Sequence, residues 1–203
     1  MMKDKNLLKR WALTVIFCLG HAAVSFAGGP GDDIKVTVAR VIGILHEPVS
    51  NGLAAKTERR QMIRQILLPR FDFAEMAKRS LGNHWRSLNG NQEEFVSAFT
   101  DFVENSFMIK IESFKDEQIA YVGQRIDTNF AQVDTKIVPL KGEPFSVSYK
   151  LHLVGGEWKV YDVVIENISL VNNFRSQFNR ILTTASFDEL LRKLREKGSG
   201  RES

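Results

Sequence analysis

Apolar side chains recur every three or four residues through the first half of the chain, the spacing of one helix face. Breaks near Pro48, Pro69 and Gly82 divide this half into four stretches. They predict helices that begin at Asp32 or Asp33, Thr57, Asp72 and Asn91, where a short polar side chain can cap the first turn. The longest of them carries the apolar stripe Phe95, Phe99, Phe102, Val103 and Phe107.

From residue 119 onward the period changes to two, which indicates strands with one apolar face. In 145–153, apolar residues alternate strictly with Ser, Lys and His. Turn signals at 127–129, 141–144 and 155–156 separate four expected strands, which cover about 119–123, 133–139, 145–153 and 158–166. Two capped helices are expected to follow, with Ser169 and Ser186 as their caps.

Helices that precede and follow an antiparallel meander make an α+β fold. We expect a strongly curved, four-stranded antiparallel sheet with helices packed across its concave face. This arrangement is similar to cone-shaped NTF2-like folds, so we also expect an enclosed apolar cavity.

The first 27 residues have the pattern of a cleaved signal peptide. A basic segment precedes the short apolar run 11–19, and Ser25-Phe26-Ala27 places small residues where a signal peptidase reads them. We therefore expect export to the periplasm, cleavage after Ala27 and one mature domain over 28–203; an uncleaved anchor is the alternative. The only cysteine, Cys18, lies in the leader, so no disulfide framework is expected in the mature domain.

The charge of the chain gives little reason to expect nucleic acid as a partner. Four of the 28 basic residues and one of the 24 acidic residues lie in the leader, which leaves a mature net charge of about +1. Motifs for phosphate loops, serine hydrolases and zinc proteases are absent from the sequence, and no two histidines have metal-ligand spacing. We expect no metal, no cofactor and a monomer.

Asp162 stands out because a carboxylate inside an apolar strand is costly unless it has a partner. One hypothesis makes it the general base of an NTF2-like enzyme that acts on a small apolar substrate. The favoured interpretation is structural: Asp162 pairs with Arg175 on the following helix or with helix-end amides.

Four segments, in this order and spacing, resemble the MlaC (toluene-tolerance) family of periplasmic phospholipid carriers. They are 71–86 with its Met-Ala, Leu-Gly and Trp-Arg pairs, 145–151, 158–163 and 169–178. Asn167 stands where the family usually has Gly, and Phe174 where it often has Tyr. Asn tolerates a left-handed backbone, so we expect that first departure to be mild.

The resemblance implies a carrier, not an enzyme, whose ligand is phospholipid and which maintains the lipid asymmetry of the outer membrane. Its implied partners are an outer-membrane lipoprotein–porin complex and an inner-membrane ABC transporter complex with a lipid-binding ring. A purely structural adaptor is a further alternative. From the apolar phase of the facing elements, the cavity is expected to be lined by Trp85, Phe99, Phe102, Val103, Tyr149, Leu151, Val164, Ile168, Leu170 and Phe174.

A basic cluster, defined as Lys56, Arg59, Arg60, Arg64 and Arg70, lies largely outside the apolar stripe of its helix. Charge runs are usually only a solvated face. The alternative hypothesis is that this cluster, together with Arg192, Lys193 and Arg195, meets acidic partner surfaces or anionic headgroups and steers their encounter.

Overall fold

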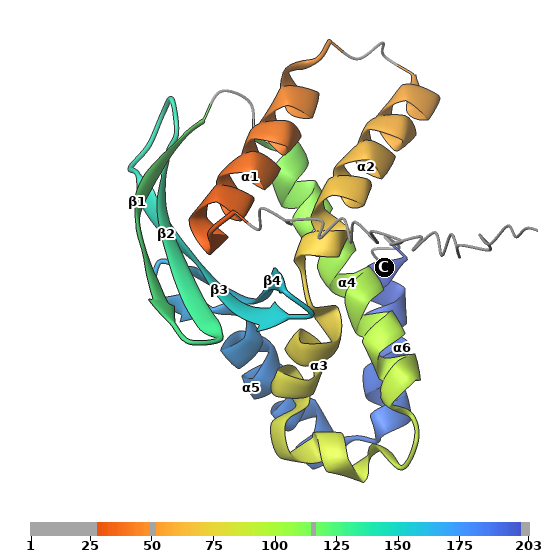
Figure 1. The fold of residues 1–203 in the computed structure, drawn as a ribbon. Helices are drawn as coiled ribbons and strands as arrows, with labels where there is room; N and C mark the ends of the chain where they lie inside the picture. Colours follow the sequence, from red (N-terminus) through yellow and green to blue (C-terminus); the bar gives the residue numbers. More distant parts are fainter. Residues whose placement is uncertain (1–27, 49–51, 115–116, 200–203) are drawn as a thin grey trace, which may run out of the picture.

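The computed structural model describes residues 28–48, 52–114 and 117–199, so the expected leader lies outside the described residues. The fold is α+β, with helices on either side of one antiparallel meander in the chain (Figure 1). The elements are α1 (Pro30–His46), α2 (Leu53–Leu67), the 3₁₀ helix η1 (Leu68–Arg70), α3 (Phe73–Leu81), the 3₁₀ helix η2 (Gly82–Leu88), α4 (Gln92–Glu112), β1 (Gln118–Asp127), β2 (Phe130–Val138), β3 (Phe145–Val154), β4 (Glu157–Ile165), β5 (Ile168–Ser169), α5 (Leu170–Thr184) and α6 (Phe187–Gly198).

Three of the expected helix caps are confirmed by side-chain hydrogen bonds. Asp72 accepts from the backbone N–H of Glu75 at 2.9 Å, and Ser169 and Ser186 play the same part at the starts of α5 and α6. Each bond satisfies one of the amide donors that a helix start leaves open. These caps therefore fix where the three helices begin.

Two helix starts were predicted wrongly. The first helix begins at Pro30, with Gly29 at the N-cap position, because proline is pre-organised for the first helical position. The second begins at Leu53, one turn before Thr57. The Thr57 hydroxyl donates to the carbonyl oxygen of Leu53 at 3.0 Å, so it bonds back along the helix and does not cap it.

The sheet has the order β1-β2-β3-β4-β5 and every neighbouring pair is antiparallel. The four expected strands are present, and the two-residue strand β5 is an addition to the four-stranded prediction. Gly155 and Gly156 form the expected turn between β3 and β4 with φ of 59° and 84°. Asn167 has a φ of 66°, the left-handed conformation expected for this residue.

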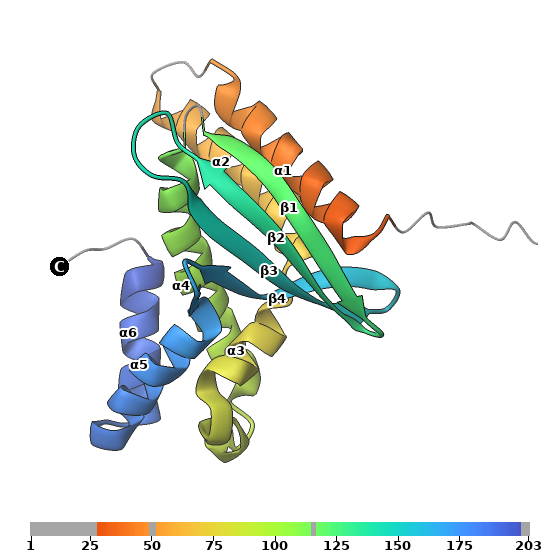
Figure 2. The same ribbon diagram turned by 90° about the vertical axis from the view of Figure 1, so that its left-hand side faces the viewer.

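Two bulges interrupt the pairing and change which residues share a face. On β1, Tyr121 pairs with Thr135 and Gly123 with Asp134, so Val122 is the extra residue. On β4, Tyr161 is the extra residue, because Asp162 pairs with Lys150 while Val160 pairs with Leu151. A bulge increases the local twist and bends the strand, which agrees with the curved sheet in Figures 1 and 2.

The helices occupy two regions around this sheet. Figures 1 and 2 show α1 across the concave face with α2 behind it, and α3, α5 and α6 beyond the other end of the sheet; α4 runs through both regions. The second region has its own helical cluster, centred on the fully buried Phe95 and Phe99, whose rings pack against Phe178. Truncating such a phenylalanine to alanine typically costs about 3–5 kcal/mol, so this cluster is a main source of stability.

Candidate functional site

A continuous apolar surface covers the concave face of the sheet. We call its side chains, together with those of α1 packed on them, the sheet cluster. Its buried members are Ile34, Ala131, Val133, Ile137, Val147, Leu151, Trp158, Val160 and Val163. The alternation of side chains along a strand explains why these residues share a face, since every second residue of β2 points to it. The residues come from α1, β2, β3 and β4, so the surface spans most of the width of the sheet.

Helix α1 covers the β1–β2 side of this surface. Ile34 is 4% exposed and Val38 is partly buried in the sheet cluster. Polar contacts hold the first turns of α1: the backbone N–H of Gly31 donates to Oε1 of Gln124 on β1 at 2.8 Å, and Asp33 lies 3.8 Å from Arg70. Partial burial raises the pKa of Asp33, and Arg70 opposes that shift. These contacts hold α1 over the β1–β2 side of the apolar face, while Phe71 and Leu170 pack on the same cluster from the segments that contact β4.

Three hydroxyl groups interrupt the apolar lining. Tyr121 and Tyr149 are partly buried members of the sheet cluster, and Thr135 on β2 pairs with Tyr121 and with Val147. The Thr135 hydroxyl donates to the carbonyl oxygen of Val147 at 2.8 Å. Burial raises the pKa of Tyr149, and burial followed by the proximity of Tyr149 raises the pKa of Tyr121 to about 12. Both phenols therefore stay protonated and neutral at physiological pH.

The ten residues expected to line the cavity do not form one group. Tyr149, Leu151 and Leu170 belong to the sheet cluster. Five others contact the helical cluster beyond the end of the sheet: Trp85, Phe99, Phe102, Val103 and Phe174. Phe71 packs against both clusters and stacks on Phe73 with 5.6 Å between ring centroids, so the two apolar regions are contiguous through this side chain.

Val164 and Ile168 lie apart from both clusters. Val164 pairs with Ser148, whereas its neighbour Val163 pairs with Tyr149 and belongs to the sheet cluster. Regular alternation from Trp158 would place the Val164 side chain on the concave face. The extra residue Tyr161 shifts the alternation by one, so Val163 faces that side in its place. Ile168 begins the short strand β5 and is 62% exposed.

Sequence reasoning missed several members of the sheet cluster, and a signal for them was present. Ala131, Val133 and Ile137 alternate with Gln132, Asp134 and Lys136, which is the period of a strand with one buried face. Ile34 and Val38 stand four residues apart on α1, as one helix face requires. What the sequence could not supply was that these two faces meet.

Asp162 has structural partners on the start of α5. Its Oδ2 accepts from the Ser169 hydroxyl at 2.7 Å and its Oδ1 from the backbone N–H of Val171 at 3.1 Å. Lys150 Nζ lies 3.5 Å from Oδ2. The expected pairing with helix-end amides is confirmed, but the pairing with Arg175 is wrong: Arg175 donates to the carbonyl oxygen of Arg79 at 2.8 Å.

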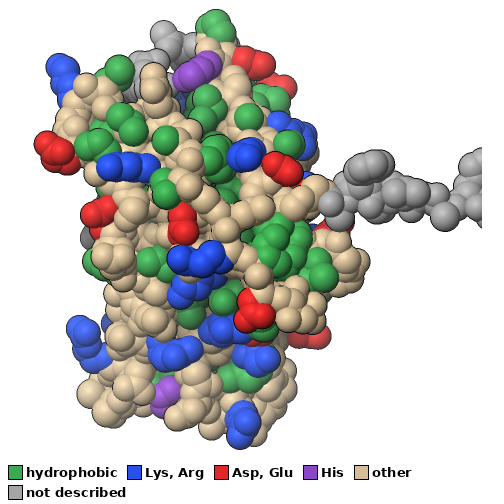
Figure 3. All heavy atoms as spheres, turned by 60° about the vertical axis from the view of Figure 1, so that its left-hand side comes forward, with side chains coloured by type: hydrophobic (Ala, Val, Ile, Leu, Met, Phe, Trp, Pro, Cys, Tyr) green, Lys and Arg blue, Asp and Glu red, His purple; other side chains and the backbone are tan. Residues whose placement is uncertain are grey.

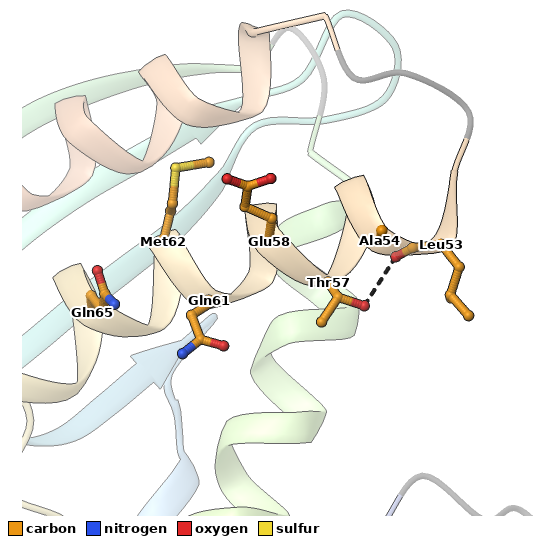
Figure 4. A pocket seen from close by; sticks show the side chains of 7 residues that line it. All are labelled: Leu53, Ala54, Thr57, Glu58, Gln61, Met62 and Gln65. Atoms are coloured by element: carbon orange, nitrogen blue, oxygen red, sulfur yellow. Dashed lines mark hydrogen bonds between the residues drawn. The ribbon is translucent and has the colours of Figure 1, made fainter.

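Two surface hollows lie away from the sheet. The larger, of about 710 Å³, is lined only by α2 residues, several of them polar, and Figure 4 shows them spread along this one helix. The second lies between α2, α4 and α6. Neither has a strand residue in its lining, so neither borders the apolar face of the sheet.

The basic cluster is largely paired within the molecule. Arg60, Arg64 and Arg70 form ion pairs with Glu112, Glu104 and Asp33, and Arg59 donates to the carbonyl oxygen of Glu47. Burial raises the pKa of Glu104, an effect that Arg64 opposes. Arg60 and Arg64 thereby link α2 to α4, and their side chains remain about half exposed, so the docking hypothesis stays a prediction.

The outer side of the sheet carries charged and polar groups beside exposed apolar side chains such as Val122 and Phe130. Asp134 on β2 accepts from Ser148 and Gln132, and His152 Nε2 lies 3.0 Å from Asp72 Oδ2 at the start of α3. Figure 3 shows Lys and Arg side chains spread over this side of the molecule with Asp and Glu between them. Within the described ranges, no His, Cys, Asp and Glu side chains gather into a possible metal site, and no helix is long and apolar enough to cross a membrane.

A curved sheet with an apolar concave face under a helical cover defines a domain suited to an apolar ligand. The chain belongs to the MlaC protein family, whose model matches residues 35–196. It is 25% identical over 146 residues to the intermembrane phospholipid transport system binding protein MlaC of Haemophilus influenzae, covering 69% of this chain and 68% of that protein.

Two further relatives extend the comparison. The chain is 30% identical over 88 residues to the toluene tolerance protein ttg2D of Pseudomonas putida, covering 43% of this chain and 39% of that protein. A phospholipid-binding protein from Ralstonia solanacearum, solved in complex with a phospholipid, has the same fold with a TM-score of 0.72 at 21% identity. The match covers 84% of this chain and 97% of that structure.

Proposed function

We propose that this protein carries phospholipid, with the acyl chains held against the concave face of the sheet. The observation that carries the proposal is the continuous apolar face of β2, β3 and β4, which α1 covers at the β1–β2 side and Phe71 and Leu170 at the β4 side. Membership of the MlaC family and the phospholipid-binding relatives support the same ligand.

Physical chemistry favours a carrier that needs no energy source of its own. Each methylene removed from water contributes about 0.8 kcal/mol, so a two-chain lipid gains on the order of 20 kcal/mol relative to water. Relative to a bilayer the gain nearly cancels, because the chains already lie in hydrocarbon. The protein can therefore hold a lipid in an aqueous compartment while its partners determine the direction of transfer.

Of the residues expected to line the cavity, we propose that Tyr149, Leu151 and Leu170 contact the acyl chains, together with Val133 and Val160. Val133, Leu151 and Val160 are each 1% exposed, so these side chains pack against their cover. A lipid then enters by separating α1 from the sheet. The apolar contacts of α1 and its polar anchors at Gly31 and Asp33 are the interactions that must give way.

The cellular setting belongs to the same proposal. The leader over 1–27 would deliver the protein to the periplasm. There it would exchange lipid with an outer-membrane lipoprotein–porin complex and an inner-membrane ABC transporter complex, and so maintain outer-membrane lipid asymmetry. The alternative of an NTF2-like enzyme has less support, because both oxygens of Asp162 are engaged by the start of α5.

A matched pair of substitutions tests where the lipid binds. Ala131 and Ala98 are both buried, at 7% and 4% exposed, but Ala131 lies in the sheet cluster and Ala98 in the helical cluster. Each is replaced by phenylalanine, and overpacking is expected to destabilise both variants by about 1–3 kcal/mol. The purified proteins are then incubated with phosphatidylglycerol vesicles, and the lipid that co-elutes with protein is counted. We expect Ala131→Phe to lose lipid and Ala98→Phe to retain it; the reverse result would move the site to the helical cluster.

A further inference from the structure

The hydroxyl of Tyr121 is a buried donor without a partner. Its oxygen is inaccessible to solvent and has no hydrogen-bond partner among the described residues. A phenylalanine at this position would avoid the cost of burying that group, because an unsatisfied polar atom loses its hydrogen bonds to water. Tyr121 lies on β1 and packs against the sheet cluster, so the unused donor is inside the proposed lipid site.

The neighbouring hydroxyls do not use this donor. Thr135 pairs with Tyr121 across β1 and β2, but its own proton goes to the carbonyl oxygen of Val147. Tyr149 interacts with the Thr135 hydroxyl, and its proximity contributes to the raised pKa of Tyr121. Tyr121 is therefore a neutral O–H group that is available to an acceptor on a ligand.

The surroundings define the kind of acceptor. Tyr121 packs against the apolar residues of the sheet cluster, and Nζ of Lys35 on α1 lies 5.2 Å from the centroid of its ring. The Lys35 side chain is 52% exposed, and its Nζ lies 3.6 Å from Oδ1 of the exposed Asp32. An apolar lining, a neutral donor and a nearby cation are the groups that suit the acyl chains, ester carbonyl and phosphate of a phospholipid.

We propose that Tyr121 donates a hydrogen bond to an ester carbonyl of the bound lipid, which makes the protein selective for ester-linked over ether-linked diacyl chains. This inference rests on the proposed carrier function and adds to it the linkage chemistry of the ligand. An ether oxygen is a weaker acceptor than a carbonyl and would leave the Tyr121 hydroxyl poorly satisfied.

The test is a competition between two phosphatidylglycerols that differ only in linkage. Protein is incubated with vesicles containing equal amounts of the diester and diether forms, and the lipids bound after gel filtration are quantified by mass spectrometry. We expect the wild-type protein to prefer the ester form about fivefold, the factor that corresponds to a hydrogen bond of ~1 kcal/mol. Tyr121→Phe should bind both forms equally.

Tyr161→Phe is the matched control, because Tyr161 packs against the helical cluster under the guanidinium of Arg79 and lies outside the sheet cluster. It should keep the wild-type preference. A preference that survives in Tyr121→Phe, or is absent from the wild-type protein, would overturn the inference and leave the carrier function standing. Failure of all three proteins to bind either lipid would instead overturn the carrier function.

A second measurement does not depend on how well the variant folds. With lipid labelled with ¹³C at its ester carbonyls, the infrared carbonyl band of the wild-type complex should contain a component at lower frequency, as hydrogen-bonded carbonyls show. A single band at the position of a carbonyl in hydrocarbon would contradict the proposal even if Tyr121→Phe could not be purified.

Discussion

The hydroxyl of Ser169 donates a 2.7 Å hydrogen bond to the carboxylate of Asp162, and this contact fastens the start of α5 to the fourth strand of the sheet. The same Ser169 oxygen accepts from the backbone N–H of Asn172, so it serves as the helix cap and the strand contact at once. Asp162 adds a bond from the N–H of Val171. A carboxylate that is 4% exposed is tolerated here because a hydroxyl, an amide and an ammonium group share its charge.

Replacing Asp162 by asparagine should lower stability without removing lipid. The amide keeps one acceptor oxygen but loses the charge that strengthens the bonds to Ser169 and Val171, and we expect a loss of about 2 kcal/mol. Denaturant titration measures the unfolding free energy of Asp162→Asn. The control is Glu143→Gln, which changes an exposed carboxyl in the β2–β3 loop. If Asp162→Asn were as stable as the control and had lost a catalytic turnover, the structural role would be refuted.

The carboxylate of Asp134 should make the unfolding free energy depend on pH in the acidic range. Partial burial works against its charge, but bonds of 2.6 Å from Ser148 and Gln132, with Arg125 nearby, lower its pKa below the ordinary 3.8. Because the folded-state pKa is the lower one, this contribution is complete above the unfolded pKa and is lost as the pH falls through 3.8 toward the folded value. The difference in unfolding free energy between the wild-type protein and Asp134→Asn should be constant above about pH 5 and change below pH 4. An unchanged difference down to pH 2 would contradict this account.

Arg64 and Glu104 should behave as an intramolecular pair. Their side chains are 2.5 Å apart, and Glu104 is the more buried of the two at 12% side-chain exposure. Arg64→Glu leaves two carboxylates facing each other and should lower stability by about 1 kcal/mol, a value discounted for the exposure of the arginine. The double variant Arg64→Glu/Glu104→Arg should recover most of that loss in thermal melts. Equal stability of the single and double variants would show that the pair contributes nothing.

Position 167, in the turn between β4 and β5, should tolerate glycine better than alanine. Asn167 has a φ of 66°, a conformation that costs a residue with a Cβ about 1–2 kcal/mol unless it is Asn or Asp. Asn167→Ala is therefore expected to melt at a lower temperature, whereas Asn167→Gly should stay close to the wild-type protein. A loss for glycine as large as that for alanine would mean that the asparagine side chain itself is required.

The helix caps and the turn that the sequence predicted correctly depend on interactions between residues close together in the chain. Asp72, Ser169 and Ser186 cap helices because the bond they make spans only three residues. The Gly155-Gly156 turn follows in the same way from backbone freedom. The fold class and the concave sheet with helices across it followed from the order of helical and strand periods.

The lining of the site depends on strand phase and on long-range packing, which one sequence specifies poorly. The bulge at Tyr161 reverses the faces of the rest of β4, which is why Val164 was expected in the lining and Val163 was not. The aromatic stripe of α4 forms a core with α5 and α6, whereas Leu151 and Tyr149 belong to the sheet cluster. No pattern within one element specifies which other element will cover it.

The measurement that tests the central claim most directly is the lipid content of the protein as purified from a Gram-negative host. Native mass spectrometry, followed by organic extraction of the same sample, should show a mass increment equal to a diacyl phospholipid and recover that lipid at about one per protein. In Ala131→Phe the increment should be absent from folded protein, while Ala98→Phe should retain it. Wild-type protein that is folded, free of lipid and unable to take it from vesicles would contradict the carrier account.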